Sequence, residues 1–499
     1  MPRTPRFLLA VAGTLAATVL AGPASAAGPP PSWCPPGADC GTVPVPSDRA
    51  DPAAGTMAIA YARFPRTDRR RPSSGVVMPN PGGPGVSTIA SADLYLGVLA
   101  PLRRHRDLLL IDVRGTGRSG AITCAPLAAA DPFAVTFAQL GTLCGGALGD
   151  RARLFSTPAA ADDLDAVREA LGYRRVDAWG DSYGTFLMTV YAARHPEHVR
   201  SIVLDGAFPV DADPWGRDVL AGTRRALRLV CSRSSGRCEG DVLLRRIARL
   251  ARELRVRPRP FTVRVPDAEH GRRGRAVRLA LDEPALAAVT FAGGDPSGYA
   301  QLPAAVSDAL RGRDARLRTL VAAARLGDAG SVGVDPRRFS IGAATAFQCH
   351  DYRRPYDLAA PPEVRRAQYA AAKAALPAGT FAPFSADAWL STNIDAGPKC
   401  LEWPALAAPR SGLTGLRLPD VPVLVQSGDL DTNTPVEQGR AAAAQFPRAQ
   451  LAVSANAGHT PDLQPCGAQQ AIRFVERLHA DVRACERSGR APRVLRTGR

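Results

Sequence analysis

A serine between two glycines, in the segment GDSYG at 180–184, stands between an apolar strand-like run at 176–179 and a helical stretch at 185–194. The pattern G-x-S-x-G at a strand-to-helix junction is typical of a strained turn that holds a nucleophilic hydroxyl out toward solvent. In an ordinary junction, Ser182 would instead cap the helix. The motif needs a strand that runs directly into a helix, and it therefore predicts a sheet covered by helices.

The rest of the chain divides into three parts. From 27 to 209, β-like runs such as 56–64 alternate with helical segments, and the same alternation returns from 419 to 499. Residues 210–418 between them are rich in Ala, Arg and Pro and mainly helical in pattern, as at 304–326. We therefore expect an α/β fold, a mostly parallel sheet with helices on both faces, interrupted by a large, mainly helical cap insertion.

The N-terminus is typical of a secretory signal peptide spanning 1–26. Arg3 and Arg6 precede an apolar stretch at 7–20, and small residues at 24–26 supply a cleavage site. No later run of 18 apolar residues is present, so no membrane insertion is expected after cleavage. These features predict a secreted protein.

The ten cysteines favour an oxidising compartment, because their number is even and no C-x-x-C suggests zinc. A helix expected at 467–484 would hold Cys466 and Cys485 about 25 Å apart, beyond the reach of a disulfide. We therefore expect these two to pair with Cys34 and Cys40. The other expected pairs join neighbours in the sequence: Cys124–Cys144, Cys231–Cys238 and Cys349–Cys400.

The net charge of +17, from 63 basic and 46 acidic residues, does not indicate nucleic-acid binding, since the arginines are scattered along the chain. The G-x-G-x-x-G at 115–120 is followed neither by a clear helix nor by an acidic residue about 20 positions on, so it predicts a turn rather than a dinucleotide site. HPEH at 195–198 is not the H-E-x-x-H of a zinc peptidase. No cofactor, metal or nucleic-acid partner is expected, and the oligomeric state is left open.

A serine hydroxyl is a weak nucleophile unless a histidine takes its proton and an acid orients that histidine. In open α/β sheets of this type the chain order is serine, acid, histidine. His459, in the loop NAGHT after an expected strand at 450–454, is the histidine that fits. Asp429 and Asp431 compete for the role of acid in the loop that follows the strand expected at 421–426.

The segment NPGGPG at 80–85 follows an apolar run at 75–78 and supplies the remaining part of the expected site. Glycines here let a backbone N–H approach a developing oxyanion closely, beside the N–H of Tyr183. By itself the segment would be a plain Pro/Gly turn. The serine, acid and histidine in the required order favour an oxyanion hole instead.

Together these motifs resemble those of the secreted actinobacterial tripeptidyl aminopeptidases, relatives of the prolyl aminopeptidases with the α/β-hydrolase fold. The resemblance covers most of the chain after the signal peptide and includes NPGGPG, DVRGTGRSG, GDSYGT, GDLDTNTPV and AGHT. The acid loop departs slightly from the usual family pattern, which keeps the choice of acid open. The resemblance implies these functional residues: nucleophile Ser182, acid Asp431, base His459, and oxyanion-hole residues Gly83 and Tyr183.

The resemblance implies a serine exopeptidase that removes short peptides, such as tripeptides, or single residues from free N-termini through an acyl-enzyme on Ser182. The insertion at 210–418 would cap the site, and one of its carboxylates would bind the substrate ammonium group. A secreted esterase or lipase is the alternative enzyme, because the fold does not determine the substrate. A non-catalytic binding protein is disfavoured by the full set of motifs. The candidate carboxylates are Asp211, Asp213, Asp282, Glu283 and Asp295.

Overall fold

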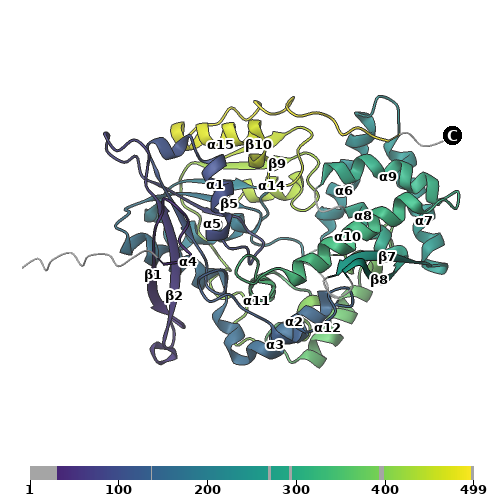
Figure 1. The fold of residues 1–499 in the computed structure, drawn as a ribbon, viewed down its shortest axis with the longest axis horizontal. Coiled ribbons are helices and arrows are strands. Elements are labelled where there is room, and N and C mark those ends of the chain that lie inside the picture. The colour runs from purple at the N-terminus through teal and green to yellow at the C-terminus, as the bar shows by residue number, and fades with distance from the viewer. Residues whose placement is uncertain (1–30, 136, 268–270, 292–294, 393–397, 496–499) are drawn as a thin grey trace, which may run out of the picture.

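An eight-stranded sheet forms the centre of the protein in the computed structural model, which describes residues 31–135, 137–267, 271–291, 295–392 and 398–495 (Figure 1). The strand order is β1-β2-β4-β3-β5-β6-β9-β10, and the neighbours from β4 to β10 pair in parallel. β1 and β2 extend one edge in antiparallel pairing. The strands are β1 (Asp39–Pro46), β2 (Thr56–Phe64), β3 (Val76–Asn80), β4 (Asp107–Ile111), β5 (Val176–Asp181), β6 (Val199–Asp205), β9 (Val423–Gly428) and β10 (Ala449–Ser454).

The sheet separates two apolar layers, because successive residues of a strand point to opposite faces. Val76 and Met78 of β3 pack into the layer that contains α4 and α5, whereas Val77 packs into the layer of α1 and α15. With helices on both faces, the expected fold class is confirmed. The covering helices are α1 (Ala92–Val98), α4 (Thr157–Ala170), α5 (Tyr183–Arg194), α14 (Val436–Ala443) and α15 (Pro465–Arg477).

Between β6 and β9 the chain leaves the sheet and is mainly helical. It also contains an antiparallel pair, β7 and β8, which the arginine-rich pattern of the segment did not indicate. The single helix expected at 304–326 is two helices, α9 and α10, separated by a turn in which Gly312 has φ +77°. The elements are α6 (Arg217–Ser232), α7 (Gly240–Val256), β7 (Arg259–Asp267), β8 (Gly271–Leu281), α8 (Glu283–Phe291), α9 (Pro296–Ala309), α10 (Ala315–Gly333), α11 (Ile341–Asp351), α12 (Pro362–Ala374) and α13 (Ala386–Leu390).

The segment between β6 and β9 contributes to two cores. Helices α6 to α10 and α13 share an apolar cluster of their own, and in Figure 1 helices α6 to α10 gather on one side of the sheet. Ala343, Ala346 and Phe347 of α11 instead pack into the layer that contains α4 and α5. Helix α11 also contacts α3 (Phe137–Leu148), which precedes α4 in the chain. The domain limits at 210 and 418 stay predictions.

All ten cysteines form disulfides, but two of the pairings differ from expectation. Cys34 pairs with Cys40, and Cys466 pairs with Cys485, with Cα–Cα distances of 5.8 and 5.9 Å. The prediction was wrong because α15 ends earlier than expected: Leu478 takes a left-handed conformation at φ 60°, and the chain turns back along the helix. The other three pairs are as expected: Cys124–Cys144, Cys231–Cys238 and Cys349–Cys400.

Candidate active site

Ser182 lies in the turn between β5 and α5. Its φ of 55° and ψ of −121° are strained for a residue with a side chain, and its side chain makes no capping hydrogen bond. Its backbone N–H donates to the carbonyl oxygen of Asp205, at the end of β6, over 2.9 Å. The hydroxyl is therefore held out of the helix, in the geometry expected for a nucleophile and not for an N-cap.

The loop after β3 touches this turn directly. A Cβ atom on Gly82, which has φ +84°, would lie 2.3 Å from the carbonyl oxygen of Asp181 and 2.8 Å from the amide nitrogen of Tyr183. On the other side of the contact, a Cβ atom on Gly184 would lie 2.3 Å from the carbonyl oxygen of Asn80. Only glycines allow these two backbones to approach so closely, which explains glycine at both positions.

His459 contacts Asp431 after β9. The imidazole Nδ1 lies 2.9 Å from Oδ2 of Asp431, whose side chain is fully buried. The carboxylate also accepts the backbone N–H groups of Asn433 and Thr434 over 2.8 and 3.1 Å, and the Thr434 hydroxyl over 2.8 Å. These bonds orient the carboxylate toward the ring. The other ring nitrogen, Nε2, lies 3.3 Å from Nδ2 of the Asn433 amide and is the nitrogen that a nucleophile would have to reach.

Asp429, the competing acid, is occupied elsewhere. Its Oδ2 pairs with a guanidinium nitrogen of Arg233 at 2.6 Å, and its Oδ1 accepts the backbone N–H of Asn456 over 2.8 Å. Arg233 directly follows α6, so this ion pair joins the acid loop to the segment between β6 and β9. Geometry therefore favours Asp431 as the partner of His459.

The protonation of His459 is set by two opposing effects. Burial disfavours the charged imidazolium, but the negative charge and hydrogen bond of Asp431 outweigh this and raise the pKa of His459 above its ordinary value. A carboxylate partner stabilises the imidazolium that forms when the ring takes a proton. The pair therefore has the electrostatics of a general base with its orienting acid.

A cavity of about 170 Å³ lies beside Ser182. Gly83 and Tyr183, the expected oxyanion residues, both line it, and the segment between β6 and β9 supplies several further lining residues. Five polar side chains here were missed by the sequence reasoning, although two of them lie two and three residues after the acid in the motif GDLDTNTP. These are Gln348, Arg353, Asn433, Thr434 and Gln438.

Among the five candidate carboxylates for a substrate amine, Asp213 lines this cavity. Burial alone would raise the pKa of Asp213, but hydrogen bonds from Arg217 hold it below its usual range, so the group stays anionic. Asp213 is itself paired with Arg217. The other four do not line the cavity and have these partners or places: Asp211 with Arg410, Glu283 with Arg255 and Ser385, and Asp282 and Asp295 at the starts of α8 and α9.

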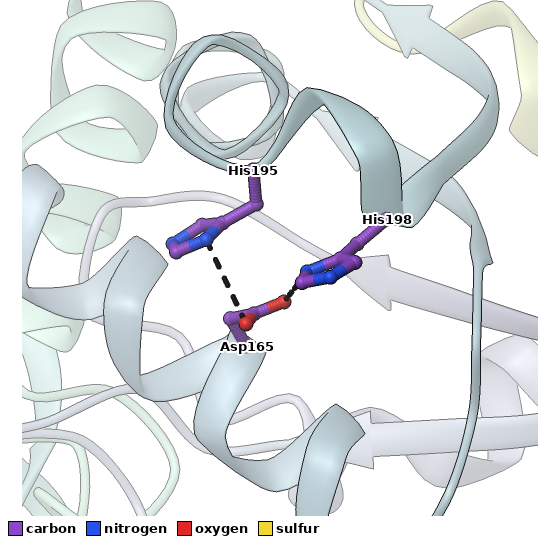
Figure 2. A group of neighbouring side chains, drawn as sticks. All are labelled: Asp165, His195 and His198. Carbon is purple, nitrogen blue, oxygen red and sulfur yellow. Dashed lines mark hydrogen bonds and ion pairs between the residues drawn. The ribbon is translucent and has the colours of Figure 1, made fainter.

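His195 and His198 form a second histidine cluster with Asp165 (Figure 2). His195 follows the last residue of α5, whereas Ser182 precedes its first. Asp165 Oδ1 lies 2.8 Å from Nδ1 of His198, and Oδ2 lies 3.6 Å from Nδ1 of His195. The carboxylate also accepts hydrogen bonds from the Arg168 guanidinium over 2.7 and 3.1 Å. A guanidinium already paired with the central carboxylate disfavours a metal cation there, and the cluster instead joins α4 to the end of α5.

The glycine-rich turn at 115–120 wraps around a buried carboxylate. Asp112 accepts the backbone N–H of Arg118 over 2.7 Å and the Ser87 hydroxyl over 2.8 Å. A Cβ atom on Gly117 would lie 2.0 Å from this carboxylate, so the turn encloses a side chain of the protein itself. Its role is structural, as the missing helix and acidic residue predict.

Two family models match this chain. One is described as the alpha/beta hydrolase fold and matches residues 75–237, and the other is described as TAP-like protein and matches residues 385–485. The chain therefore has the α/β-hydrolase fold. The two matched segments contain Ser182 in the first and both Asp431 and His459 in the second.

Several curated proteins are similar to part of this chain. The chain is 34% identical over 187 residues to a tripeptidyl aminopeptidase of Streptomyces coelicolor, covering 33% of this chain and 34% of that protein. It is 36% identical over 202 residues to serine protease Hip1 of Mycobacterium tuberculosis, covering 36% and 38%. It is 35% identical over 197 residues to a Mycobacterium tuberculosis protein named carboxylesterase B, covering 36% and 37%.

The chain spans about a third of the length of the curated relatives it matches. Within that part, the resemblance to the tripeptidyl aminopeptidases is confirmed. Among solved structures, a thermophilic esterase from Thermogutta terrifontis is similar at 16% identity and a TM-score of 0.36, covering 88% of this chain and 100% of that one.

Proposed function

We propose that this chain is a secreted serine exopeptidase that releases short peptides, such as tripeptides, or single residues from free peptide N-termini. Ser182 Oγ attacks the scissile carbonyl while His459 Nε2 takes its proton and Asp431 stabilises the imidazolium. The oxyanion faces the N–H groups of Gly83 and Tyr183. His459 then protonates the leaving amine, and water hydrolyses the acyl-enzyme.

The observation that carries this proposal is that the end of β6 brings the serine turn and the histidine loop together. The Asp205 carbonyl accepts the Ser182 N–H over 2.9 Å, and a Cβ atom on the next residue, Gly206, would lie 3.1 Å from Cε1 of His459. The nucleophile turn and the oriented imidazole therefore meet at the carboxyl edge of the sheet, where α/β proteins of this type bind ligands.

The exopeptidase mode rests on the cavity beside Ser182. A volume of about 170 Å³ accommodates a few side chains and not a folded protein. Asp213 supplies one carboxylate at its wall, and a substrate ammonium group would share that carboxylate with Arg217. The guanidinium of Arg353 lines the same cavity. A substrate held in this way would present the carbonyl of one of its first residues to Ser182.

A secreted esterase is the second candidate, because one relative is named carboxylesterase B. The same serine, histidine and oxyanion groups would act on an ester carbonyl, and the fold does not distinguish the two. Asp213 distinguishes the two proposals, since a neutral ester has no ammonium group for this carboxylate to bind.

Secretion rests on the cysteines and on the N-terminal pattern. All ten cysteines are paired, as expected in an oxidising compartment. The signal peptide expected at 1–26 lies outside the described residues. Within the described part of the chain, no helix has the length and apolarity that crossing a membrane requires.

The first experiment compares the protein with its Ser182→Ala variant on three substrates: a tripeptidyl amide with a free N-terminus, the same peptide N-acetylated, and a short acyl ester. We expect cleavage of the free-amine peptide, lowered by about 10⁶-fold in the variant, and little cleavage of the acetylated peptide. Cleavage of the ester with both peptides untouched would replace the peptidase by the esterase.

The amine anchor is tested by Asp213→Asn, with Asp211→Asn as the matched control on the same loop. Loss of the Asp213 charge should raise KM for the free-amine peptide by roughly 30-fold and leave the short ester unaffected. Asp211 is exposed and paired with Arg410, so its replacement should leave KM unchanged for both substrates. Equal KM values for Asp213→Asn and the unmodified protein would remove Asp213 from the proposal.

A further inference from the structure

Three carboxyl groups are buried directly behind the serine turn and the histidine loop. Asp181 immediately precedes Ser182, Asp205 ends β6, and Asp462 lies in a short 3-10 helix, Pro461–Leu463, just after His459. One oxygen of each carboxyl group lies within 4.8 Å of the other two. Their exposed fractions are 5%, 0% and 1%. The proposed reaction uses none of these three side chains.

The hydrogen bonds that the structure describes to these carboxyl groups come from neutral donors. The Tyr95 hydroxyl donates to Asp181 Oδ2 over 2.7 Å, and the Trp179 indole N–H donates to Asp181 Oδ1 and Asp462 Oδ2 over 2.9 and 3.0 Å. The backbone N–H of Asp462 donates to Asp205 Oδ2 over 2.7 Å. Three negative charges so close together in the interior would repel strongly without a cation to balance them.

Two carboxyl oxygens in the cluster lack a hydrogen-bond partner among the residues that the structure describes, and a proton on a neighbouring carboxyl group would supply one. Oδ1 of Asp205 and Oδ1 of Asp462 are buried and have no hydrogen-bond partner as carboxylate atoms. The side chains of Asp181 and Asp462 lie in hydrogen-bonding contact, and so do those of Asp462 and Asp205. An O–H on Asp462 that donates to Asp205 would give these two buried oxygens a partner. An O–H on Asp181 that donates to Asp462 would extend the same chain of hydrogen bonds to the end of β5.

The titration of the groups agrees with this arrangement. Burial raises the pKa of Asp181 and of Asp462 well above the usual range, and a neighbouring carboxylate raises each further. Burial raises the pKa of Asp205 to about 7. Asp205 is therefore the first of the three to lose its proton, and above about pH 7 two protons are shared by three carboxyl groups, with the negative charge on Asp205.

We propose that Asp181, Asp462 and Asp205 form a proton-sharing chain that holds the serine turn against the histidine loop, and that Asp462 is a positioning residue for the reaction at Ser182. The chain joins the end of β5, the 3-10 helix and the end of β6 by O–H···O bonds. The inference rests on the proposed roles of Ser182 and His459. The added claim is that Ser182 and His459 can react only while the buried carboxyl groups hold these protons.

Loss of one of the two shared protons to solvent leaves a second carboxylate in the cluster. The two anions repel, and the added charge also favours the imidazolium form of His459, which cannot act as a base. Reactivity of Ser182 should therefore decline on the alkaline side. The titratable groups that face the cluster are Tyr95 from α1, His459 from its loop and Asp431 after β9.

The same protons link the cluster to stability. In the folded protein these groups hold protons that the unfolded chain releases above about pH 4. The stability they contribute is therefore fully present below that pH and is lost as the pH rises toward the raised folded values. Replacing Asp462 by asparagine removes one such group and should make the melting temperature less dependent on pH.

The experiment compares Asp462→Asn with Asp462→Ala. The readouts are the rate at which a small fluorophosphonate without an amine acylates Ser182 between pH 5 and 10, and the melting temperature over the same range. In the asparagine variant, the amide oxygen can accept the Trp179 N–H and the amide NH₂ can donate to Asp205. We therefore expect the acylation rate of this variant near pH 7 to lie within about threefold of that of the unmodified protein. The alkaline decline in its rate should begin about one pH unit higher. The acylation rate of the alanine variant should be about 10²-fold lower than that of the unmodified protein.

Asp177→Asn is the matched control. Asp177 is a buried carboxylate at the other end of β5, but it is paired with the guanidinium groups of Arg106 and Arg200. Its replacement should lower the melting temperature and leave the pH profile of acylation unchanged. A shifted profile in this control would show that any lost buried carboxyl moves the profile, and would overturn the proposal.

Three other results would overturn it. The first is an asparagine variant with the unmodified protein's pH profiles for both acylation and melting, and the second is an alanine variant with the unmodified rate. The third is a stoichiometric divalent cation in the purified protein whose removal by EDTA abolishes acylation, since a metal would then bridge the carboxylates in place of protons. A Ser182 that does not react at all would sink the proposed function instead, and the melting profiles would still decide the proton-sharing chain.

Discussion

At the scale of single residues, the chemistry depends on which of two neighbouring carboxylates faces the imidazole of His459. Asp431 is fully buried, lies 2.9 Å from the ring and is fixed by three further hydrogen bonds. Asp429 is two residues away in the chain and is bound to Arg233. The two aspartates differ in the direction in which the loop points each side chain, and this direction cannot be read from the residue type.

Asp431→Asn should lower kcat by about 10⁴-fold, because an amide can neither fix the tautomer of His459 nor stabilise its charged form. In the unmodified protein the raised pKa of His459 places the acid limb of kcat/KM above pH 6.5, since the ring must be neutral to act as a base. Removing the charge should move that limb to lower pH. Asp429→Asn is the control, with lowered stability and activity within about tenfold. The reverse ranking in steady-state kinetics would exchange the two roles.

At the scale of elements, the site is made by two turns that touch: the loop after β3 and the turn between β5 and α5. Their contact is backbone against backbone, as the distances around Gly82 and Gly184 show. Parallel pairing of β3 with β5 brings the two turns to the same edge of the sheet. The loop after β3 and Ser182 are therefore neighbours because the strands that lead into them, β3 and β5, are neighbours.

Gly82→Ala should damage this contact, because its Cβ atom would lie 2.3 Å from the carbonyl oxygen of Asp181, at a φ of +84°. We expect a loss of roughly 2–3 kcal/mol in the free energy of unfolding and a fall in kcat of about 10²-fold. Gly97→Ala in α1 is the control, since among the described residues no atom beyond its chain neighbours and its own helix backbone lies within 4 Å of its Cβ position. It should be neutral or more stable by up to ~1 kcal/mol. Denaturant unfolding and steady-state kinetics would measure both variants. Full activity in Gly82→Ala would show that the loop after β3 does not contribute to catalysis.

At the scale of the whole molecule, five disulfides secure a fold with more than one apolar core. Cys349–Cys400 joins the end of α11 to residues that pack in the same layer as α4 and α5, and it closes a loop of 51 residues in sequence separation. Cys231–Cys238 closes a separation of only 7 at the end of α6. A longer closed loop restricts the unfolded chain more strongly.

Replacing Cys349 and Cys400 by serine should therefore lower the free energy of unfolding by about 4 kcal/mol. The same change at Cys231 and Cys238 should lower it by roughly 2.5 kcal/mol, because the closed loop is shorter. Denaturant titrations of the two double variants would measure the difference. A larger loss at Cys231–Cys238 would show that native contacts around the bridge, and not chain entropy, dominate.

Local features of the chain could be recognised from sequence because they depend on neighbours in the chain. The strand at 56–64 has the limits expected from its alternating pattern, and the turn at Ser182 follows from glycines on both sides. The order of serine, acid and histidine follows from the connectivity of the fold. These features need side-chain periodicity and local backbone strain, which adjacent residues determine.

The sequence by itself therefore determined the α/β alternation, the candidate residues and three of the five disulfides. Only the tertiary structure decided that His459 faces Asp431, that Asp213 lines the cavity, and that Cys466 pairs with Cys485 after α15 turns back at Leu478. It also brought three aspartates from separate elements behind Ser182. The physical reason is that a side chain's partners across the fold depend on the direction in which each loop leaves its strand, and residue type and spacing along the chain do not encode that direction.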